Sequence, residues 1–397
     1  MKRILALTVA MLMAAAVFGQ GTIKIGATWP LSDITGKQGT MSAQLAVEEI
    51  NKAGGLLGKK LELIVIDDEL KADKGAAAIE KLVTVDKVEL LVGGMASGVA
   101  LGQIPAMKKY GLPVVSTGAA SYKVEEALGA DADWYFHLHP WDYNQGQSYV
   151  DGWAAIRAKY AGIKMQRIFL AYEEGAFGKA SYDASKALFA KEYAFDGAPF
   201  KSAAAGGGDY SSVLEAAKDF KPDLFYWAGY DADALPILEQ SKAMKFVPGM
   251  YLGSPPGWPA GFGNSPLADN VMLYGMWAPS MNDTNAASKK YSDAFKAKYG
   301  EEPATYFAPL SYSAIYVVAE AIKRAGTTEP KALIKALEAT KYASPMGELI
   351  TFTPSNIIKH QGIKRQKILQ WQKGKQEVIW PFEAQTKGLI YPFPAWK

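Results

Sequence analysis

The stretch AVEEINKAGGLLGKKLELIVIDDE, from Ala46 to Glu69, carries the pattern that decides the fold. Apolar residues at helical spacing lead into an Ala-Gly-Gly stop at residues 53–55, which is typical of a helix end. An apolar run over residues 61–66 follows and ends in two aspartates. A helix, a glycine stop and a buried strand in this order predict one unit of an α/β protein.

The same alternation continues on both sides of this stretch. Residues 23–27 alternate apolar and small or polar side chains, which indicates a strand, and a loop over residues 29–39 follows it. Downstream, the pattern predicts a helix at 74–85, a strand at 90–93, a helix at 98–110 and a strand at 113–116. Strict alternation predicts a parallel sheet with helices on both faces.

A second α/β block follows a pause over residues 131–149. It contains strands at 167–172, 223–228 and 249–253 and helices at 180–193, 211–220 and 232–244. Three further helices at 286–299, 312–325 and 330–339 and a strand-rich tail from residue 348 come after it. The fold class is therefore α/β with two doubly wound, Rossmann-like lobes, whose last elements are added late in the chain.

Composition excludes several classes of function. The chain of 397 residues is long enough for two domains, and it has no cysteine, so thiol catalysis, disulfides and cysteine metal sites are excluded. Its net charge is +3, and we find no block of five or more like charges, so we expect no nucleic-acid partner.

The first residues predict a secretory leader. Met1-Lys2-Arg3 precede an apolar run over residues 4–18 and small residues near Gly19, where we expect cleavage. No cysteine follows the apolar run, so no lipid anchor is expected there, and no second long apolar stretch predicts a membrane span. We expect a protein that is secreted, soluble and periplasmic.

Ligands of doubly wound sheets bind beyond the carboxyl ends of the strands. The turn at residues 93–98, with Ser97, and the turn at residues 117–121 both follow strands and carry small residues, which suits an anion at a helix N-terminus. Aromatic residues that could wall a closing cleft follow other strands; they are Trp29, Phe177, Tyr230 and Trp258.

No catalytic set accompanies these turns. The residues around Ser97 fail the spacing of a nucleophile elbow, and Gly-x-Gly-x-x-Gly of a dinucleotide site is absent. His137 and His139 lie on one strand face, but no further ligand completes a metal site, so we interpret them as structural. We therefore expect a binding protein with no enzymatic activity, no cofactor and no metal.

The opening segment resembles the type I periplasmic binding proteins, and within them the leucine/isoleucine/valine-binding branch. Residues 23–39 and 46–69 carry the first part of the resemblance. Five later segments continue it in order; they are LLVGGMASG, GLPVVSTGAAS, EEGAFGKA, FYWAGYDADA and SYSAIYVVAEAI. The resemblance implies three hinge crossovers between the lobes, hinge closure around one solute and an ABC permease as partner of a monomer. We expect the signal peptide to cover residues 1–21. The resemblance then implies an N-terminal lobe of residues 22–141 plus 280–349 and a C-terminal lobe of residues 142–279 plus 350–397.

The resemblance also implies site residues. A ligand carboxylate would be held by Ser97, Gly118 and Ala120, with Ser121 beside them. An aromatic of the first loop is replaced by Gln38, and the second-lobe aromatics fall on Phe177 and Tyr230.

One departure concerns the acid that pairs with a ligand ammonium. The loop at residues 254–258 has none, and Asp231 or Asp33 would have to replace it, although Asp231 could equally cap the helix from residue 232. The solute is therefore either a branched-chain or other hydrophobic amino acid or a small carboxylate, aromatic acid or amide without an α-ammonium. An extracellular sensory ligand-binding protein is the alternative to a transport component.

Overall fold

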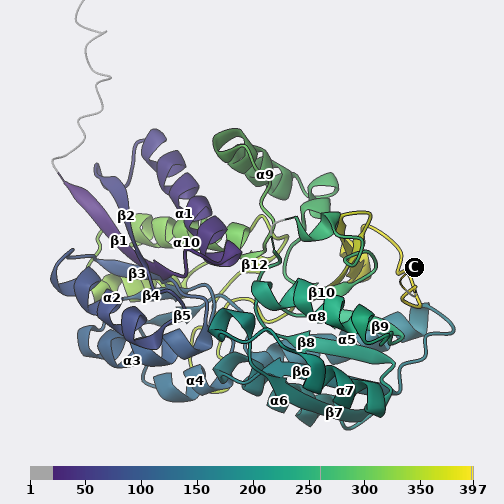
Figure 1. Cartoon of the computed structure of the whole chain (residues 1–397). Coiled ribbons are helices and arrows are strands. Elements are labelled where there is room, and N and C mark those ends of the chain that lie inside the picture. The colour runs from purple at the N-terminus through teal and green to yellow at the C-terminus, as the bar shows by residue number, and fades with distance from the viewer. Residues whose placement is uncertain (1–20, 260, 395, 397) are drawn as a thin grey trace, which may run out of the picture.

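The structure is a computed structural model, and it describes residues 21–259, 261–394 and 396. The expected leader lies almost entirely outside the described residues, so it stays a prediction. The described chain forms two lobes side by side, each built on its own sheet (Figure 1). Within the described ranges, no helix is long and apolar enough to cross a membrane.

The first lobe is built on five parallel strands in the order β2-β1-β3-β4-β5. The central strands β1, β3 and β4 are almost wholly buried because helices cover both faces, which explains their nearly continuous apolar sequence. The strands are β1 (Thr22–Trp29), β2 (Lys60–Asp67), β3 (Leu90–Gly93), β4 (Val114–Ser116) and β5 (Tyr135–His137).

Helices α1 and α10 pack together on one face of this sheet, and α2 and α3 pack together on the other (Figure 1). A two-stranded ladder of β11 (Tyr342–Ala343) and β12 (Leu349–Ile350) lies beside α10. The helices of this lobe are α1 (Ile34–Lys52), α2 (Ala72–Thr84), α3 (Ser97–Tyr110), α4 (Tyr122–Leu128), α9 (Ala286–Tyr299), α10 (Phe307–Ala325) and α11 (Pro330–Glu338).

The second lobe has a seven-stranded sheet in the order β14-β13-β10-β9-β8-β6-β7. Five strands are parallel, and the hairpin β13–β14 from the chain's tail adds two antiparallel strands beside β10. The strands are β6 (Arg167–Glu173), β7 (Ala194–Phe200), β8 (Leu224–Ala228), β9 (Met250–Gly253), β10 (Met272–Gly275), β13 (Lys367–Gln372) and β14 (Lys375–Trp380).

Helices also cover both faces of the second sheet. The buried side chains of α5 and α6 pack in one core, and those of α7 and α8 pack in the core on the other face. The helices are α5 (Asp142–Lys159), α6 (Ala176–Phe189), α7 (Ser211–Phe220) and α8 (Asp231–Ala243), with short 3₁₀ turns at η1 (Ala203–Ala205), η2 (Phe262–Asn264), η3 (Pro279–Asp283) and η4 (Phe382–Ala384).

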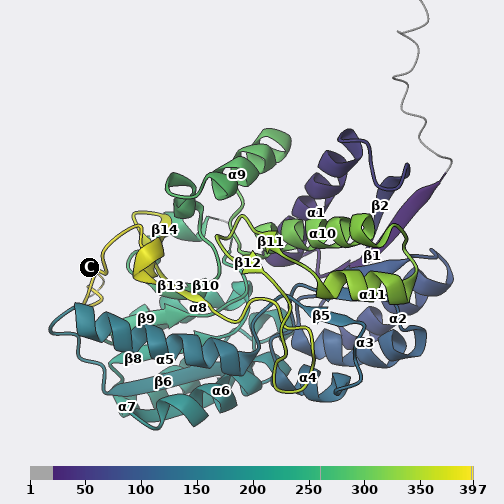
Figure 2. The same cartoon turned by 180° about the vertical axis from the view of Figure 1, so that it is seen from behind.

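The chain passes between the two sheets at residues 138–141, 276–285 and 351–366, and these segments contact one another. The Ile363 N–H donates to the Leu138 carbonyl at 3.0 Å, and Lys367 Nζ donates to the Met276 carbonyl at 3.0 Å. In Figure 2 the yellow-green segment after β12 runs past α4 before it reaches β13, where the Ile357 N–H donates to Glu125 Oε1. The chain thus crosses between the two sheets at three adjacent connections, whereas their action as a hinge and the exact lobe boundaries at 141/142, 279/280 and 349/350 stay predictions.

The structure confirms the α/β class with two wound sheets and corrects several local expectations. The helix predicted over 180–193 ends at Phe189, and residues 194–200 form β7, an edge strand whose Gly197 and Pro199 interrupt the apolar pattern. The pause over 131–149 contains β5 and the start of α5. Helix α10 begins at Phe307 instead of residue 312, because Pro309 is tolerated in a first turn.

Candidate functional site

A small cavity lies where the carboxyl ends of strands from both sheets meet. Its walls come from both lobes and from the first connection between them. The first lobe contributes Met95, Ala96, Ser97, Ala119, Ala120, Tyr306 and Phe307, the connection and α5 contribute His139 and Gln145, and the second lobe contributes Phe177, Tyr230, Ser254 and Pro256. This is the position at which wound sheets bind ligands.

Four of the residues predicted from the sequence line this cavity: Ser97, Ala120, Phe177 and Tyr230. Gly118 and Ser121 flank Ala120 in the same turn, and Ser121 is fully buried and caps α4 through the Lys123 N–H. The structure therefore brings the two small-residue turns of the first lobe against the aromatic residues of the second lobe.

Four other predicted residues lie elsewhere. Trp29 is fully buried beneath Gly93, and Trp258 packs in the second-lobe core with its ring centroid 4.5 Å from that of Phe262. Gln38 is 2% exposed and bonds the loop before α10, where its Oε1 accepts the Ala304 N–H at 2.7 Å. Asp231 is the first residue of α8 and does not line the cavity. A large or amphipathic side chain after a strand can face the core as readily as the cleft, and the sequence pattern does not distinguish the two.

Donors for an anion gather at the start of α3. Ser97 is the first residue of this helix, no side chain caps it, and its first turn has no acid. The first N–H groups of a helix have no partner within the helix, so they remain available to a ligand and give the end a partial positive charge. Ser97 Oγ accepts the Ser121 N–H at 3.2 Å, which leaves its own proton free to donate.

The turn after β4 faces this helix end. Ala119 has a left-handed φ of 68° and its N–H donates to the Met95 carbonyl at 2.8 Å, which joins the two turns. No hydrogen bond connects the N–H of the adjacent Ala120 to another described residue. Ala120 therefore presents a further backbone donor at the cavity wall.

At the N-termini of α6 and α8 in the second lobe, acidic side chains already accept hydrogen bonds from backbone N–H groups and offset the partial positive charge of the helix. Glu173 accepts the N–H groups of Gly175 and Gly178 at 2.6 and 2.7 Å at the start of α6. Asp233 accepts the Tyr230 N–H at 2.7 Å at the start of α8. Burial raises the pKa of the Glu173 carboxyl. An anion in the cavity is therefore attracted to α3 and not to α6 or α8.

The rest of the wall is neutral. His139 Nδ1 donates to the Pro140 carbonyl at 2.9 Å, so its Nε2 accepts the Tyr306 hydroxyl proton at 3.1 Å. Burial, followed by the nearby His137, lowers the pKa of His139 to about 3, so the ring is uncharged. Gln145 uses its amide on the Pro140 carbonyl and the Tyr149 hydroxyl. Of the thirteen described residues that line the cavity, none carries a carboxylate or a cation.

Aromatic rings form much of this wall. Phe177 and Tyr230 of the second lobe have ring centroids 6.0 Å apart, and Tyr306 and Phe307 of the first lobe have centroids 4.9 Å apart. Sequence reasoning missed four lining residues, because they belong to the first connection, to α5 and to the start of α10 and not to a strand-end turn; they are His139, Gln145, Tyr306 and Phe307. The adjacent Tyr306-Phe307 pair before a long apolar helix was the one local signal available.

Residues 22–376 match the periplasmic binding protein family. The chain belongs to this family. A "Leu/Ile/Val-binding protein homolog 7" of Brucella melitensis is 24% identical, over 98% of this chain and 99% of the relative. The "Leucine-, isoleucine-, valine-, threonine-, and alanine-binding protein" of Pseudomonas aeruginosa is 27% identical, over 83% of this chain and 85% of the relative.

Solved structures of periplasmic binding proteins share the fold. The branched-chain amino acid transporter substrate-binding protein of Streptococcus pneumoniae, in complex with isoleucine, has a TM-score of 0.76 at 24% identity and covers 94% of this chain and 100% of its own. A solute-binding protein of an ABC transporter from R. palustris, in complex with benzoate, has a TM-score of 0.75 at 21% identity over 94% and 98% of the two chains. As a member of the periplasmic binding protein family, the chain is a binding protein and not an enzyme.

His137 and His139, which the sequence places on one strand face, are parts of the protein interior. His137 is fully buried and stacks on Trp141 with centroids 3.6 Å apart. Across the residues placed in the structure, no group of three or more His, Asp or Glu side chains is arranged to hold a metal ion.

Proposed function

We propose that this periplasmic binding protein binds a small carboxylate with an apolar, ring-sized body and no α-ammonium, and delivers it to an ABC permease outside the cytoplasm by closure of its two lobes. The observation that supports this most is the combination of free anion donors at the start of α3 with walls that carry no acid. We expect the Ser97 hydroxyl, the Ala120 N–H and the first N–H groups of α3 to hold the carboxylate.

The argument against an ammonium is energetic. A buried cation without an acceptor costs several kcal/mol, and a neutral His139, Gln145 and Ser254 do not replace a carboxylate. The body of the solute would instead lie among Phe177, Tyr230 and Phe307, whose rings favour contact with an apolar or aromatic group.

Relatives of similar fold support the proposal without deciding it. The R. palustris protein noted above is in complex with benzoate, and another solute-binding protein, from Rhodopseudomonas palustris BisB5, is in complex with 3,4-dihydroxy benzoic acid, with a TM-score of 0.74 at 20% identity over 95% of this chain and 98% of that one. The family thus accommodates aromatic acids on this fold.

A hydrophobic amino acid is the second candidate. The names of the Brucella and Pseudomonas relatives favour it, and Asp231 is placed at the start of α8, next to the cavity-lining Tyr230. For this candidate Asp231 would have to turn toward the ammonium on binding.

Matched pairs of solutes separate the two candidates. Isothermal titration of the mature protein with 3-phenylpropanoate and phenylalanine, and with 4-methylpentanoate and leucine, compares the same carbon skeleton with and without the ammonium. We expect the acid of each pair to bind at least about tenfold more tightly, because the unpaired ammonium costs more than 1.4 kcal/mol. Tighter binding of leucine than of 4-methylpentanoate would replace this proposal by the second candidate.

A further inference from the structure

The turn between β2 and α2 holds two successive residues in a backbone conformation that side chains disfavour. Glu69 has a φ of 49° and Leu70 a φ of 58°, although neither is glycine. Left-handed φ values are uncommon for bulky residues and persist where the surrounding structure imposes them. The cause of this conformation therefore has to be sought in the contacts of the turn.

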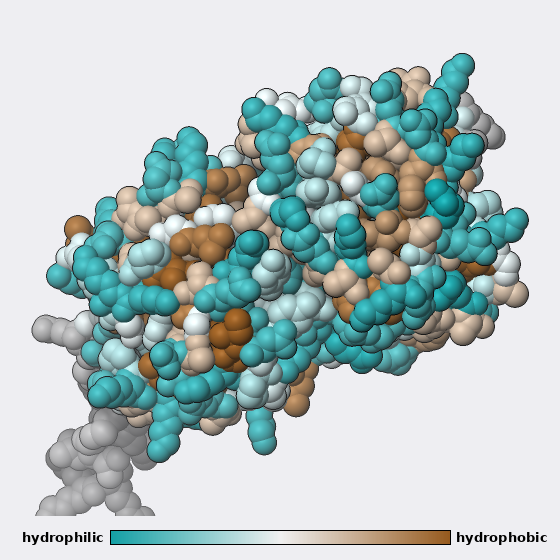
Figure 3. All heavy atoms as spheres, turned by 90° about the horizontal axis from the view of Figure 1, so that it is seen from below, coloured by the Kyte–Doolittle hydropathy of each residue, from teal (hydrophilic) through white to brown (hydrophobic). Residues whose placement is uncertain are grey.

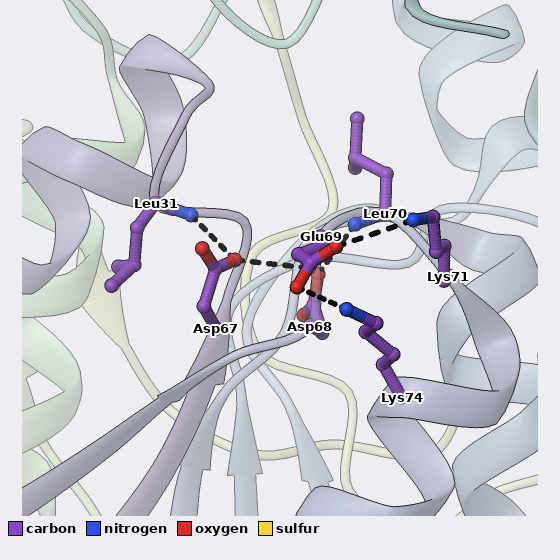
Figure 4. Close-up of polar contacts among 7 residues, drawn as sticks. All are labelled: Leu31, Asp67, Asp68, Glu69, Leu70, Lys71 and Lys74. Atoms are coloured by element: carbon purple, nitrogen blue, oxygen red, sulfur yellow. Dashed lines mark hydrogen bonds and ion pairs between the residues drawn. The ribbon is translucent and has the colours of Figure 1, made fainter.

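Hydrogen bonds from two aspartates fix the turn (Figure 4). Asp67 Oδ1 accepts the N–H of Leu31 at 3.1 Å and of Glu69 at 2.9 Å, which ties the turn to the loop after β1. Asp68 is 1% exposed, and its Oδ1 accepts the Leu70 N–H at 3.0 Å. The Glu69 carboxylate is thereby directed outward, where it pairs with Lys71 and Lys74.

The half-buried Leu70 side chain of this turn packs next to residues that line the cavity. Leu70 packs against a small buried cluster made of Met95, Ala96, Val99 and Phe307, on which Tyr230 and Tyr306 also pack. Of these seven residues, all except Leu70 and Val99 line the cavity. Leu70 therefore lies behind the wall that the solute would touch. Tyr230 of the second lobe also packs against this cluster, so the cluster joins the two lobes.

We propose that Leu70 is a positioning residue that limits the length of the solute, by supporting the wall of Met95, Ala96 and Phe307 from behind. This inference rests on the proposed function in one respect, that the cavity is the solute site. The hydrogen bonds to Asp67 and Asp68 fix the turn that carries Leu70, so they also hold its side chain against this cluster.

The test is a change in the preference for long over short solutes. Titration with benzoate and 4-butylbenzoate gives a ratio of dissociation constants for the parent, for Leu70→Ala and for Leu70→Phe. We expect Leu70→Ala to shift this ratio by about tenfold in favour of 4-butylbenzoate, and Leu70→Phe to shift it against that solute, since a few methylenes in a packed pocket carry this discrimination. A loss of stability alone would weaken both solutes equally and leave the ratio unchanged.

Leu57→Ala is the matched control. Leu57 is also a leucine with a left-handed φ, of 52°, but it is 45% exposed and belongs to the turn before β2. Its replacement is expected to leave the ratio at the parent value. An unchanged ratio in both Leu70 variants would overturn the inference.

The two proposals fail in distinguishable ways. If the parent binds leucine and phenylalanine but neither benzoate nor 4-butylbenzoate, the proposed solute class is wrong. The Leu70 variants are then compared by the ratio of their affinities for phenylalanine and alanine. If no solute of either class binds the parent, both the proposed function and the role of Leu70 are overturned.

Discussion

The carboxyl groups of Asp33 and Asp231 interact across the boundary between the two lobes, from the starts of helices α1 and α8. Asp33 is 6% exposed and accepts the Thr35 N–H at 2.7 Å. Burial, followed by the negative charge of Asp231, raises the pKa of the Asp33 carboxyl from its ordinary 3.8 to about 7. If the lobes open, the two groups move apart, so we expect a lower pKa of the Asp33 carboxyl in the open state.

The first prediction is that solute affinity depends on pH. A carboxyl whose pKa is higher in the closed state takes up a proton on closure, so closure is favoured as the pH falls through about 7. The gain levels off below the lower pKa of the open state. We expect 3-phenylpropanoate to bind about 3- to 10-fold more tightly at pH 6 than at pH 8. Isothermal titration across this pH range measures the slope of the logarithm of the dissociation constant against pH.

Asp33→Asn is the variant for this experiment, because Asn caps α1 about as well as Asp. Asp142, at the start of α5, also has a pKa raised to about 7 by burial and would add its own slope, so the difference between parent and variant isolates Asp33. Asp209→Asn is the control, since Asp209 likewise accepts an N–H from the first turn of a helix, that of Ser211, at an exposed site. Equal slopes for parent and Asp33→Asn would contradict the prediction.

Ser97→Ala tests the anion site. Loss of the Ser97 hydroxyl is expected to weaken solute binding by up to about 3 kcal/mol if the solute group that it contacts is a carboxylate, and by about 0.5–1.5 kcal/mol if that group is neutral. The fold should be nearly unaffected. Ser211→Ala, which changes the first residue of α7 away from the cavity, is the control. An affinity equal to that of the parent would place the solute elsewhere.

Asp231→Asn decides whether an ammonium is bound next to Tyr230. Asp231 Oδ1 accepts the Ala232 N–H at 2.7 Å, and Asp233 provides the capping bond to Tyr230, so the substitution leaves α8 capped. Under the proposed function, binding of 3-phenylpropanoate is retained. A selective loss of leucine or phenylalanine binding would support the amino-acid candidate instead. The same titration series measures both.

Lobe closure is expected to make the molecule more compact. The lobes are joined by three adjacent connections, and a solute that contacts both lobes favours the closed state by its differential affinity. Small-angle scattering with saturating solute should give a smaller radius of gyration than without it. Two identical profiles would argue against hinge closure.

Gly93→Ala is expected to destabilise the first lobe. Gly93 has a φ of 99°, and an added Cβ would lie 2.8 Å from the ring of the buried Trp29. Backbone strain and overpacking together should lower the free energy of unfolding by about 2–4 kcal/mol. Gly111→Ala, with a φ of 63° and open space around it, isolates the backbone part, at about 1 kcal/mol. Urea denaturation of both variants measures the difference.

The surface is consistent with a protein that keeps its apolar groups for the interior. Figure 3 shows hydrophilic residues over most of one face, with apolar residues in scattered patches. Large exposed apolar side chains are few and far apart in the sequence; the described ones are Leu31, Leu57, Val85, Val247, Leu349 and Ile390. The permease partner and the monomeric state stay predictions.

The amino-acid sequence by itself determined the two wound sheets and the turns at their strand ends. Apolar periodicity and glycine stops are local, so they predict where a strand ends and a helix begins. Ser97, Ala120, Phe177 and Tyr230 follow strands and line one cavity, because the carboxyl ends of parallel strands meet at one edge.

Only the tertiary structure decided which side chains face the cavity. His139 reaches it through the first connection between the lobes, and Gln145 reaches it through α5. Tyr306 and Phe307 reach it through a helix that joins the first lobe more than 150 residues after β5. Trp29, Gln38 and Trp258 turn away because other partners bury them. The interaction between Asp33 and Asp231 likewise exists only where the lobes meet. These contacts depend on the packing of distant segments, and no local pattern encodes the direction of a side chain relative to a distant neighbour.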